Sequence, residues 1–236
     1  MTEILCYGDS YLKEFEAVVT GSALNGVVLN QTAFYPGGGG QPSDIGLLSG
    51  KEGDYKVTKI VKHEGVIVHV IEGDIPEVGD AVKGVIDWTR RYQLMRTHTA
   101  LHILCGVVWR EFGAKVTGGN MQPGSARMDF ELDSMSSDFA EQVENLINTE
   151  VKASRSIVVE NFSREEAFKI PDLIRTKINL LPPAIKEIRT VNIEGLDLQA
   201  DGGTHVSNTC EVGNIRVTGH ESKGRINKRL RIEIDL

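Results

Sequence analysis

Two histidine-bearing strings hold the side chains whose types and spacing are best suited to chemistry. They read HTALH at residues 98–102 and, roughly a hundred residues later, DGGTH at residues 201–205. Residues four apart lie one turn above each other on one face of an α-helix, so both imidazoles of the first string can reach a single point. The second string adds one more imidazole and a carboxylate. Four candidate ligands of one ion follow: His98, His102, His205 and Asp201. Imidazole and carboxylate are ligands of Zn²⁺, and a partly open site binds a reactive water, so the pattern predicts a zinc hydrolase.

The second string also has a purely structural explanation. Asp-Gly and Gly-Gly are typical of hairpin turns, and His205 would then simply follow the turn. That explanation accounts for the glycines but not for an acid-x-x-x-His spacing beside HxxxH. The first string lacks the Glu of HExxH, so it carries no built-in general base. Cys210 is a rival ligand to Asp201. Zn²⁺ suits this donor set better than Ca²⁺ or Mg²⁺, while nickel and iron stay open.

The composition is typical of a soluble globular protein with one large or two small domains. The 236 residues are 40% hydrophobic and 25% charged, with a formal net charge of −7. An acidic chain is unsuited to indiscriminate nucleic-acid binding, which argues against DNA, but a local basic face is compatible with a specific RNA. Neither a secretory leader nor a membrane span is expected, because the first residues lack a basic region followed by an apolar one and no apolar run reaches membrane-spanning length. Three widely spaced cysteines favour a reducing cytoplasm.

Residues 1–88 are rich in β-branched runs that Gly, Asp, Asn and Pro clusters separate. Strands are expected at 26–29, 55–61, 66–71 and 81–86. Short strands at this spacing predict a small β-barrel as the first domain.

The pattern changes near residue 88, and a second domain is expected over residues 89–236. Its clearest helix is 90–112, where one buried stripe is predicted by Leu94, Leu101, Leu104, Val108 and Phe112. Asp87 or Thr89 is expected to cap this helix and Gly113 to end it. Other helices are expected at 136–153 and 163–169, and strands at 126–132, 191–193, 215–217 and 230–234. Strands and helices mixed in this order predict an α+β fold.

A third segment joins the two strings in pointing to one family. Residues 30–46 read NQTAFYPGGGGQPSDIG. They resemble the motif T-x-F-Y-x-x-x-G-G-Q-x-x-D-x-G of the alanyl-tRNA synthetase editing domain and of its free-standing relatives, the AlaX proteins. HTALH followed by DGGTHV resembles the other two motifs of this family, the last of which is usually CGGTH. Because the three motifs span both halves of the chain in the family's order, the chain resembles the medium-sized AlaX type.

The resemblance implies a fold and a ligand set. The fold is an N-terminal β-barrel (1–88) followed by an α/β two-layer editing domain (89–236), similar to the threonyl/alanyl-tRNA synthetase second additional domain. One Zn²⁺ would be bound by His98, His102 and His205, with Asp201 where Cys is usual. A carboxylate binds Zn²⁺ less tightly than a thiolate, so Asp201 is expected either as a fourth ligand or beside a three-histidine site.

The resemblance also implies an activity, the hydrolysis of the ester in tRNA(Ala) wrongly charged with serine, with glycyl-tRNA(Ala) left open. Serine is larger than alanine by one hydroxyl, so a size filter fails and the pocket must bind that hydroxyl. The candidate substrate-binding residues are Thr97, Thr99, Asn120, Gln122, Gly38, Gly39 and Gln41. The glycines let backbone approach a ligand closely. Thr204 is the candidate catalytic residue.

The densest cationic stretch is KGRINKRLR at residues 223–231, from which Arg225, Lys228 and Arg229 are expected to contact tRNA phosphates.

The oligomeric state, monomer or homodimer, stays open. Two other functions also remain: a zinc hydrolase of a small ester or amide, and a tRNA-binding module with a structural zinc. A closed four-ligand site would favour the structural role, because catalytic zinc keeps one position open.

Overall fold

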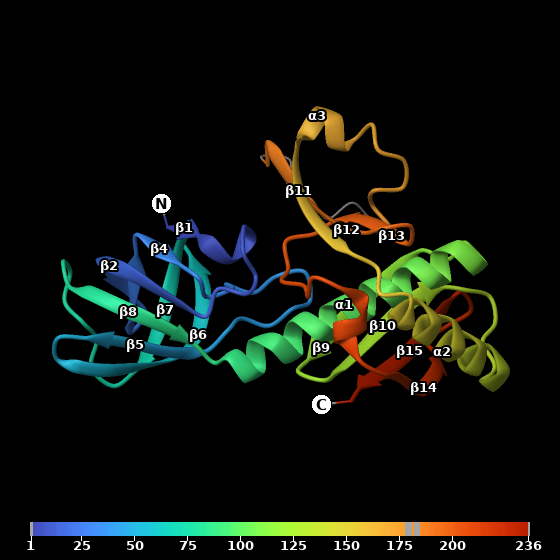
Figure 1. Cartoon of the computed structure of the whole chain (residues 1–236), viewed down its shortest axis with the longest axis horizontal. Helices are drawn as coiled ribbons and strands as arrows, with labels where there is room; N and C mark the ends of the chain where they lie inside the picture. Colours follow the sequence, from blue (N-terminus) through green and yellow to red (C-terminus); the bar gives the residue numbers. More distant parts are fainter. Residues whose placement is uncertain (1, 178–180, 182–184, 236) are drawn as a thin grey trace. The chain divides into compact units, whose positions relative to one another are not determined.

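The chain divides into two units, Met1–Gln93 and Leu94–Leu236. The structure is a computed structural model and describes residues 2–177, 181 and 185–235. In the described residues, unit 1 consists of strands, one 3₁₀ turn and the first residues of helix α1 (Trp88–Phe112), whereas unit 2 mixes helices with two sheets (Figure 1). The expected α+β class is confirmed.

Unit 1 is built around a closed six-stranded barrel in the order β2-β3-β7-β6-β5-β8, with each neighbouring pair antiparallel. Its strands are β2 (Glu14–Ala23), β3 (Gly26–Leu29), β5 (Gly46–Gly50), β6 (Gly53–His63), β7 (Val66–Glu72) and β8 (Ala81–Ile86). Two short strands, β1 (Glu3–Ile4) and β4 (Gln31–Thr32), pair in parallel, and the turn η1 (Leu5–Tyr7) follows β1. The predicted barrel is confirmed, and β3, β6, β7 and β8 fall on the four predicted runs.

Side chains alternate between the barrel interior and its outer surface, as the pleat requires. In β2, Phe15 and Val19 are buried, while the flanking residues are exposed. Two glycines permit the closest approaches. A Cβ on Gly84 would lie 2.2 Å from the Phe15 ring, and one on Gly46 would lie 2.2 Å from the carbonyl oxygen of Val85. The tight interior therefore excludes even a methyl group at these two positions.

A buried ion pair organises the motif segment of unit 1. Arg91 is fully buried, pairs with Asp44, and donates hydrogen bonds to the carbonyl oxygens of Ser10 (3.0 Å) and Ala33 (2.6 Å). Asp44 also accepts a hydrogen bond of 2.6 Å from the backbone N–H of Tyr35. A buried charge is stable only when it is paired and hydrogen-bonded. The pair thereby fixes both ends of the segment between Tyr35 and Asp44.

The glycine run inside that segment forms a hydrogen-bonded turn. Gly38 and Gln41 exchange two backbone hydrogen bonds of 3.1 and 2.9 Å, and the Tyr35 hydroxyl donates to the Gly38 carbonyl at 3.1 Å. All four residues from Gly37 to Gly40 have positive φ, which only glycine adopts without strain. The run is therefore conformationally obligatory in this turn.

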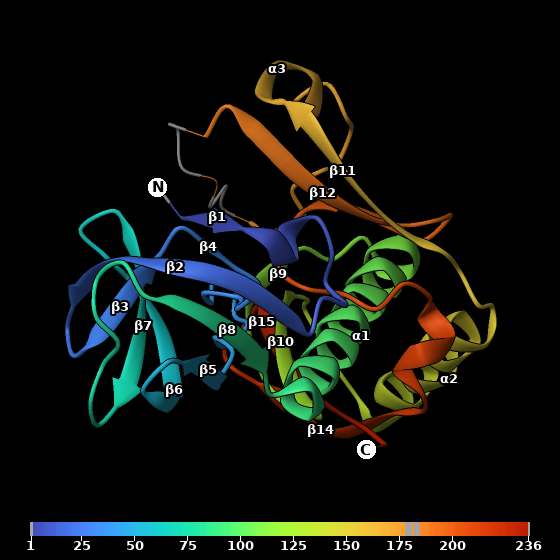
Figure 2. The ribbon, with the colours of Figure 1, turned by 60° about the vertical axis from the view of Figure 1, so that its left-hand side comes forward.

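Among its described residues, unit 2 contains two antiparallel sheets, most of α1, two further helices and one 3₁₀ turn. The four-stranded sheet has the order β14-β15-β10-β9, with β9 (Val116–Gln122), β10 (Ser125–Glu131), β14 (Ile215–Ser222) and β15 (Asn227–Ile234). The three-stranded sheet comprises β11 (Ile157–Ser163), β12 (Glu187–Ile193) and β13 (Asp197–Ala200). The remaining elements are α1 from its seventh residue on, α2 (Ser137–Lys152), α3 (Arg164–Ala167) and the turn η2 (Thr209–Val212). Helix α2 lies beside β14 (Figure 2).

Helix α1 is buried on every side over residues 97–108, so the prediction of a single buried stripe is wrong. The stripe residues Leu94, Leu101, Leu104 and Val108 are buried as expected, but so are the polar residues Thr97 and His98. The reason is that other segments contact α1 from several directions, among them the β9–β10 turn at Gly124 and the β12–β13 turn at Leu196. None of the described helices combines the length and the apolar character needed to span a bilayer.

The predicted helix ends are confirmed. Asp87 accepts a hydrogen bond of 3.0 Å from the backbone N–H of Arg90 and caps α1, and Gly113, at φ +63°, follows its last residue. Ser136 caps α2 in the same way, whereas α3 is shorter than the predicted 163–169. The predicted strands in unit 2 correspond to β10, β12, β14 and β15, and β9, β11 and β13 come in addition.

His69 is a neutral imidazole in the barrel interior. Its Nδ1 lies 3.2 Å from the Val27 carbonyl oxygen and its Nε2 lies 2.8 Å from the Thr32 hydroxyl. Because a carbonyl only accepts, Nδ1 carries the proton and Nε2 accepts from Thr32. Burial lowers the pKa of His69 to about 4.

We expect His69→Gln to reduce the acid sensitivity of folding. Between pH 6.5 and about 4, the unfolded imidazole binds a proton that the folded protein excludes. Folding stability therefore falls as the pH drops through this window, by about 3 kcal/mol at pH 4, and the group costs nothing at pH 7. Urea unfolding of both proteins at pH 7 and pH 4 measures the difference. Equal losses of unfolding free energy in the two proteins would contradict this expectation.

Candidate metal centre

Three imidazoles from distant parts of unit 2 meet beside the middle of α1. His98 and His102 lie one helical turn apart, with ring centroids 5.2 Å from each other. The ring of His205, from the segment between β13 and η2, lies 4.3 Å from that of His98 and 4.7 Å from that of His102. All three residues are buried, so water does not compete for their nitrogens.

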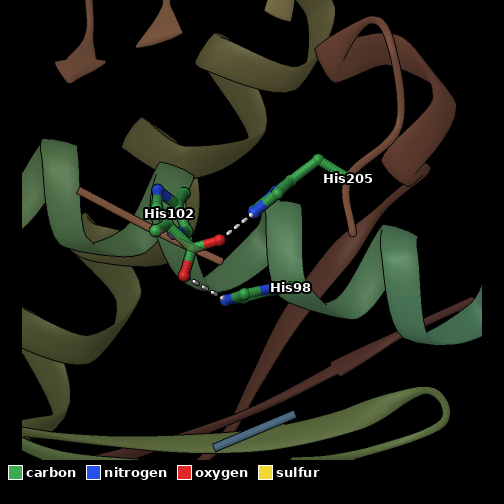
Figure 3. A group of neighbouring side chains, drawn as sticks. His98, His102 and His205 are labelled. Atoms are coloured by element: carbon green, nitrogen blue, oxygen red, sulfur yellow. Dashed lines mark hydrogen bonds and ion pairs between the residues drawn. The ribbon is translucent and has the colours of Figure 1, made fainter. Parts of the chain in front are cut away.

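Asp201 completes the cluster. Its Oδ1 lies 3.6 Å from Nε2 of His98, and its Oδ2 lies 3.0 Å from Nε2 of His205. The backbone N–H of Gly203 donates to Oδ2 at 2.6 Å, which folds the DGG turn back on its own carboxylate. Figure 3 shows the rings of His98, His102 and His205 grouped around the carboxylate, with the two contacts dashed.

The donor geometry fits a metal ion. One ligand atom from each of His98, His102, Asp201 and His205 lies within 4.8 Å of the others. A tetrahedral ion bound at roughly 2.1 Å holds its ligands about 3.4 Å apart, close to the 3.0 and 3.6 Å separations between Asp201 and two of the imidazoles. Three imidazoles and one carboxylate are the donor chemistry of a transition-metal ion such as zinc. Cys210 is exposed in η2 and lies outside this group.

Burial and mutual contact set the charges in the cluster. Burial holds the pKa of His98 well below its ordinary value and lowers the pKa of His205 to about 4. Burial alone would lower the pKa of His102 also, but the hydrogen bond to Asp197 raises it overall. Burial would raise the pKa of Asp201, but His98 and His205 outweigh it and hold that pKa well below its usual range. Near neutral pH the neutral imidazoles of His98 and His205 therefore lie beside the Asp201 carboxylate, which suits a cation.

Two of the imidazoles also have a partner on the side facing away from the cluster. The Nδ1 of His102 lies 3.1 Å from Asp197, and the Nδ1 of His205 lies 3.1 Å from the hydroxyl of Thr99. Sequence reasoning missed Asp197, because it stands four residues before the DGG turn in a separate strand and no local pattern links it to His102. Thr99 was expected at the substrate, and the structure places its hydroxyl on His205.

The other substrate-binding candidates occupy different places. Thr97 is buried and accepts a hydrogen bond of 3.0 Å from the backbone N–H of Gly124. Asn120 and Gln122 are exposed on β9, on the opposite side of the strand from the buried Met121, and line a shallow depression of about 320 Å³. Thr204 is fully buried next to His205. Gly38, Gly39 and Gln41 belong to the glycine turn of unit 1, where Gln41 is buried.

The three cationic candidates differ in their surroundings. Lys228 is buried, and its ammonium donates to the carbonyl oxygens of Gly224 and Arg225, both at 2.8 Å. Arg229 donates to both carboxylate oxygens of Asp129, at 2.6 and 2.8 Å. The side chain of Arg225 is exposed. Arg225 is thus the candidate whose charge is most available to an external phosphate.

Comparison with known proteins places both units among tRNA-synthetase modules. The family model of class II (A) tRNA synthetases matches residues 5–90, and that of the threonyl and alanyl tRNA synthetase second additional domain matches residues 188–231. The second match includes Asp201 and His205. The barrel and part of the α+β unit thus each resemble a part of the aminoacyl-tRNA synthetases, as the sequence resemblance implied.

Relatives that match nearly the whole chain identify its family within the synthetase-related proteins. The alanyl-tRNA editing protein AlaX-M of Saccharolobus solfataricus is 42% identical over 234 residues, which cover 98% of each chain. The AlaX-M protein of Methanosarcina acetivorans is 38% identical over 239 residues, again 98% of each chain. The alanine–tRNA ligase of Ignicoccus hospitalis is 39% identical over 222 residues, which are 92% of this chain but 24% of the ligase. The chain belongs to the AlaX-M family of alanyl-tRNA editing proteins.

We expect His205→Ala to weaken divalent-ion binding by more than the roughly 10–100-fold that loss of an outer hydrogen-bond partner costs, because it removes a direct ligand. His220→Ala is the matched control, since His220 lies on β14 outside the cluster. Competition with a chromophoric chelator measures both affinities. Equal affinities in the two variants would exclude His205 as a ligand.

Proposed function

We propose that the chain is a metal-dependent esterase that removes serine from tRNA(Ala) wrongly charged with it. The observation that carries the proposal is the group of three buried imidazoles and one half-buried carboxylate, in a chain of the AlaX-M family. The relatives in Saccharolobus and Methanosarcina carry the name of alanyl-tRNA editing proteins. Glycyl-tRNA(Ala) is a second substrate to be tested beside the seryl ester.

We propose Zn²⁺ as the ion, with His98, His102 and His205 as ligands and Asp201 either as a fourth ligand or beside a three-histidine site. Imidazole and carboxylate together favour zinc over calcium and magnesium, which prefer all-oxygen sites. When bound, zinc supplies a Lewis acid that polarises a carbonyl, or a water whose pKa is lowered to about 7.

The protein's own side chains are proposed to position the reacting groups and to stabilise the charge that develops on them. An aminoacyl ester is already activated, so its hydrolysis needs a positioned water and stabilisation of developing charge. Thr204 is proposed to donate a hydrogen bond at the reacting group, because it is buried directly beside His205. Burial of the three imidazoles and of Thr204 strengthens each such interaction, since the local dielectric is low.

Discrimination between serine and alanine is proposed to depend on the seryl hydroxyl. A pocket that hydrogen-bonds a hydroxyl rejects the analogue without it by about 10⁴–10⁵-fold, because its polar groups then lose their partners. Thr97 and Thr99 are the proposed polar groups on the metal-bearing helix, and Asn120 and Gln122 those on β9. The turn Gly38–Gln41 is proposed to help place the end of the tRNA.

A structural ion in a tRNA-binding module is the alternative that one observation favours. If Asp201 binds the ion together with all three imidazoles, four protein ligands fill a tetrahedron and leave no position for water. The two functions differ in turnover: only the esterase releases free serine. A zinc hydrolase of small esters would release acid from such esters and leave Ser-tRNA(Ala) intact.

We expect the purified zinc-loaded protein to deacylate Ser-tRNA(Ala) and to leave Ala-tRNA(Ala) largely charged. His98→Ala should abolish this activity, because the ion loses a ligand, and His220→Ala should retain it. Release of radiolabelled amino acid measures both substrates. Zinc bound without any serine release would instead support the structural ion, and equal release of serine and alanine would refute recognition of the hydroxyl.

We expect Arg225→Ala to weaken tRNA binding and to lower the slope of log affinity against log salt by about 1, the change expected for loss of one phosphate contact. Arg229→Ala should have a smaller effect, since its guanidinium is already paired with Asp129. Filter binding at several salt concentrations measures both slopes. A slope unchanged by Arg225→Ala would remove this residue from the tRNA interface.

A further inference from the structure

A second carboxylate, Asp197, stands behind the candidate metal centre. It is the first residue of β13, and its side chain is fully buried. Its Oδ2 lies 3.1 Å from Nδ1 of His102 and accepts a second hydrogen bond of 2.6 Å from the side-chain amide of Gln199. Neither Asp197 nor Gln199 belongs to the four-residue cluster.

The chemistry of this contact sets the tautomer of His102. A carboxylate accepts hydrogen bonds and donates none, so the proton shared with Asp197 belongs to Nδ1 of the imidazole. The neutral ring then carries its lone pair on Nε2, the only nitrogen left to bind an ion. We propose that Asp197 is a positioning residue that holds His102 in the tautomer and orientation required for metal binding, an inference that rests on the metal site of the proposed function.

A glycine on α1 makes room for this arrangement. Gly106 lies one turn after His102, and a Cβ placed on it would lie 3.0 Å from Cβ of Asp197 and 3.0 Å from Cγ of Leu196. The β12–β13 turn therefore rests directly on the helix backbone at this point. This close approach brings Asp197 within hydrogen-bond distance of the imidazole.

Fold stability alone is a weak explanation for a carboxylate in this place. A buried charge is costly, and apolar replacements of buried ion pairs are often neutral or stabilising. The Oδ1 of Asp197 has no hydrogen-bond partner among the described residues, and the guanidinium of Arg175 is 3.9 Å away. The strong contacts of this carboxylate converge on Oδ2, the oxygen that faces His102. The negatively charged oxygen of Asp197 that makes these contacts is therefore the one beside the His102 imidazole.

Metal affinity tests the inference without reference to catalysis. Asp197→Asn keeps the size of the side chain and removes the charge, and it should weaken Zn²⁺ and Co²⁺ binding by about 10–100-fold. Asp129→Asn is the matched control, because Asp129 is a buried carboxylate paired with Arg229 in the other sheet. Chelator competition gives the affinities, and the absorption spectrum of the Co²⁺ protein reports the ligand field. A thermal melt in EDTA checks that each metal-free variant is folded.

Gly106→Ala provides a second, independent variant. It changes no polar residue and favours the helix, but its methyl group would lie 3.0 Å from Cβ of Asp197 and should shift that side chain away from His102. It should weaken Co²⁺ binding and change the Co²⁺ spectrum while the melting temperature in EDTA is retained. Should Asp197→Asn fail to fold, this variant decides the question by itself.

The possible outcomes distinguish failure of the proposed metal site from failure of the role proposed for Asp197. Wild-type protein that binds neither Zn²⁺ nor Co²⁺ would refute the metal site of the proposed function. Wild-type protein that binds the ions, with Asp197→Asn and Gly106→Ala equally tight and spectrally unchanged, would overturn the role of Asp197 and leave the metal site standing. Weaker binding in both variants, with Asp129→Asn unaffected, would support it.

Discussion

A carboxylate taken out of water governs the candidate centre of unit 2. Asp201 is stable at this place because imidazoles and a backbone N–H surround it, and two of these imidazoles, His98 and His205, stay neutral because burial disfavours their protonated forms. Neither half of this arrangement is favourable alone. Together they place a carboxylate beside neutral imidazole nitrogens, an arrangement that is complementary to a divalent cation.

Buried charges are also paired with opposite charges at other places where distant segments of a unit meet. In unit 1, the buried charge of Arg91 is matched by Asp44, and the pair holds the two ends of the glycine-bearing segment. In unit 2, the buried Glu150 accepts hydrogen bonds from Arg110 and Arg155. Because an unpaired buried charge costs several kcal/mol, each pair penalises any register in which its segments do not meet. Buried charges therefore contribute specificity of arrangement in both units.

Local patterns predicted a large part of the fold. The β-branched runs led directly to β3, β6, β7 and β8, and capping chemistry placed both ends of α1. Strand β2 has a clear alternation around Phe15 and Val19, but its charged and small residues concealed it. Strand β9 contains Gly118 and Gly119, and most of β11 is exposed, so neither has the periodicity that reveals a strand. These strands form because neighbouring strands pair with them.

The candidate ligands followed from spacing, because a separation of four residues has a fixed meaning on a helix and a DGG turn has few backbone geometries. Interactions between segments far apart along the chain have no such local signature. The contact of Asp197 with His102 spans 95 residues, and that of Thr99 with His205 spans 106. Which polar group faces the substrate, and which instead supports an imidazole, depends on how helix, hairpin and turn pack together. Residue order alone does not contain that information, because packing is decided by the mutual burial of side chains from the whole unit.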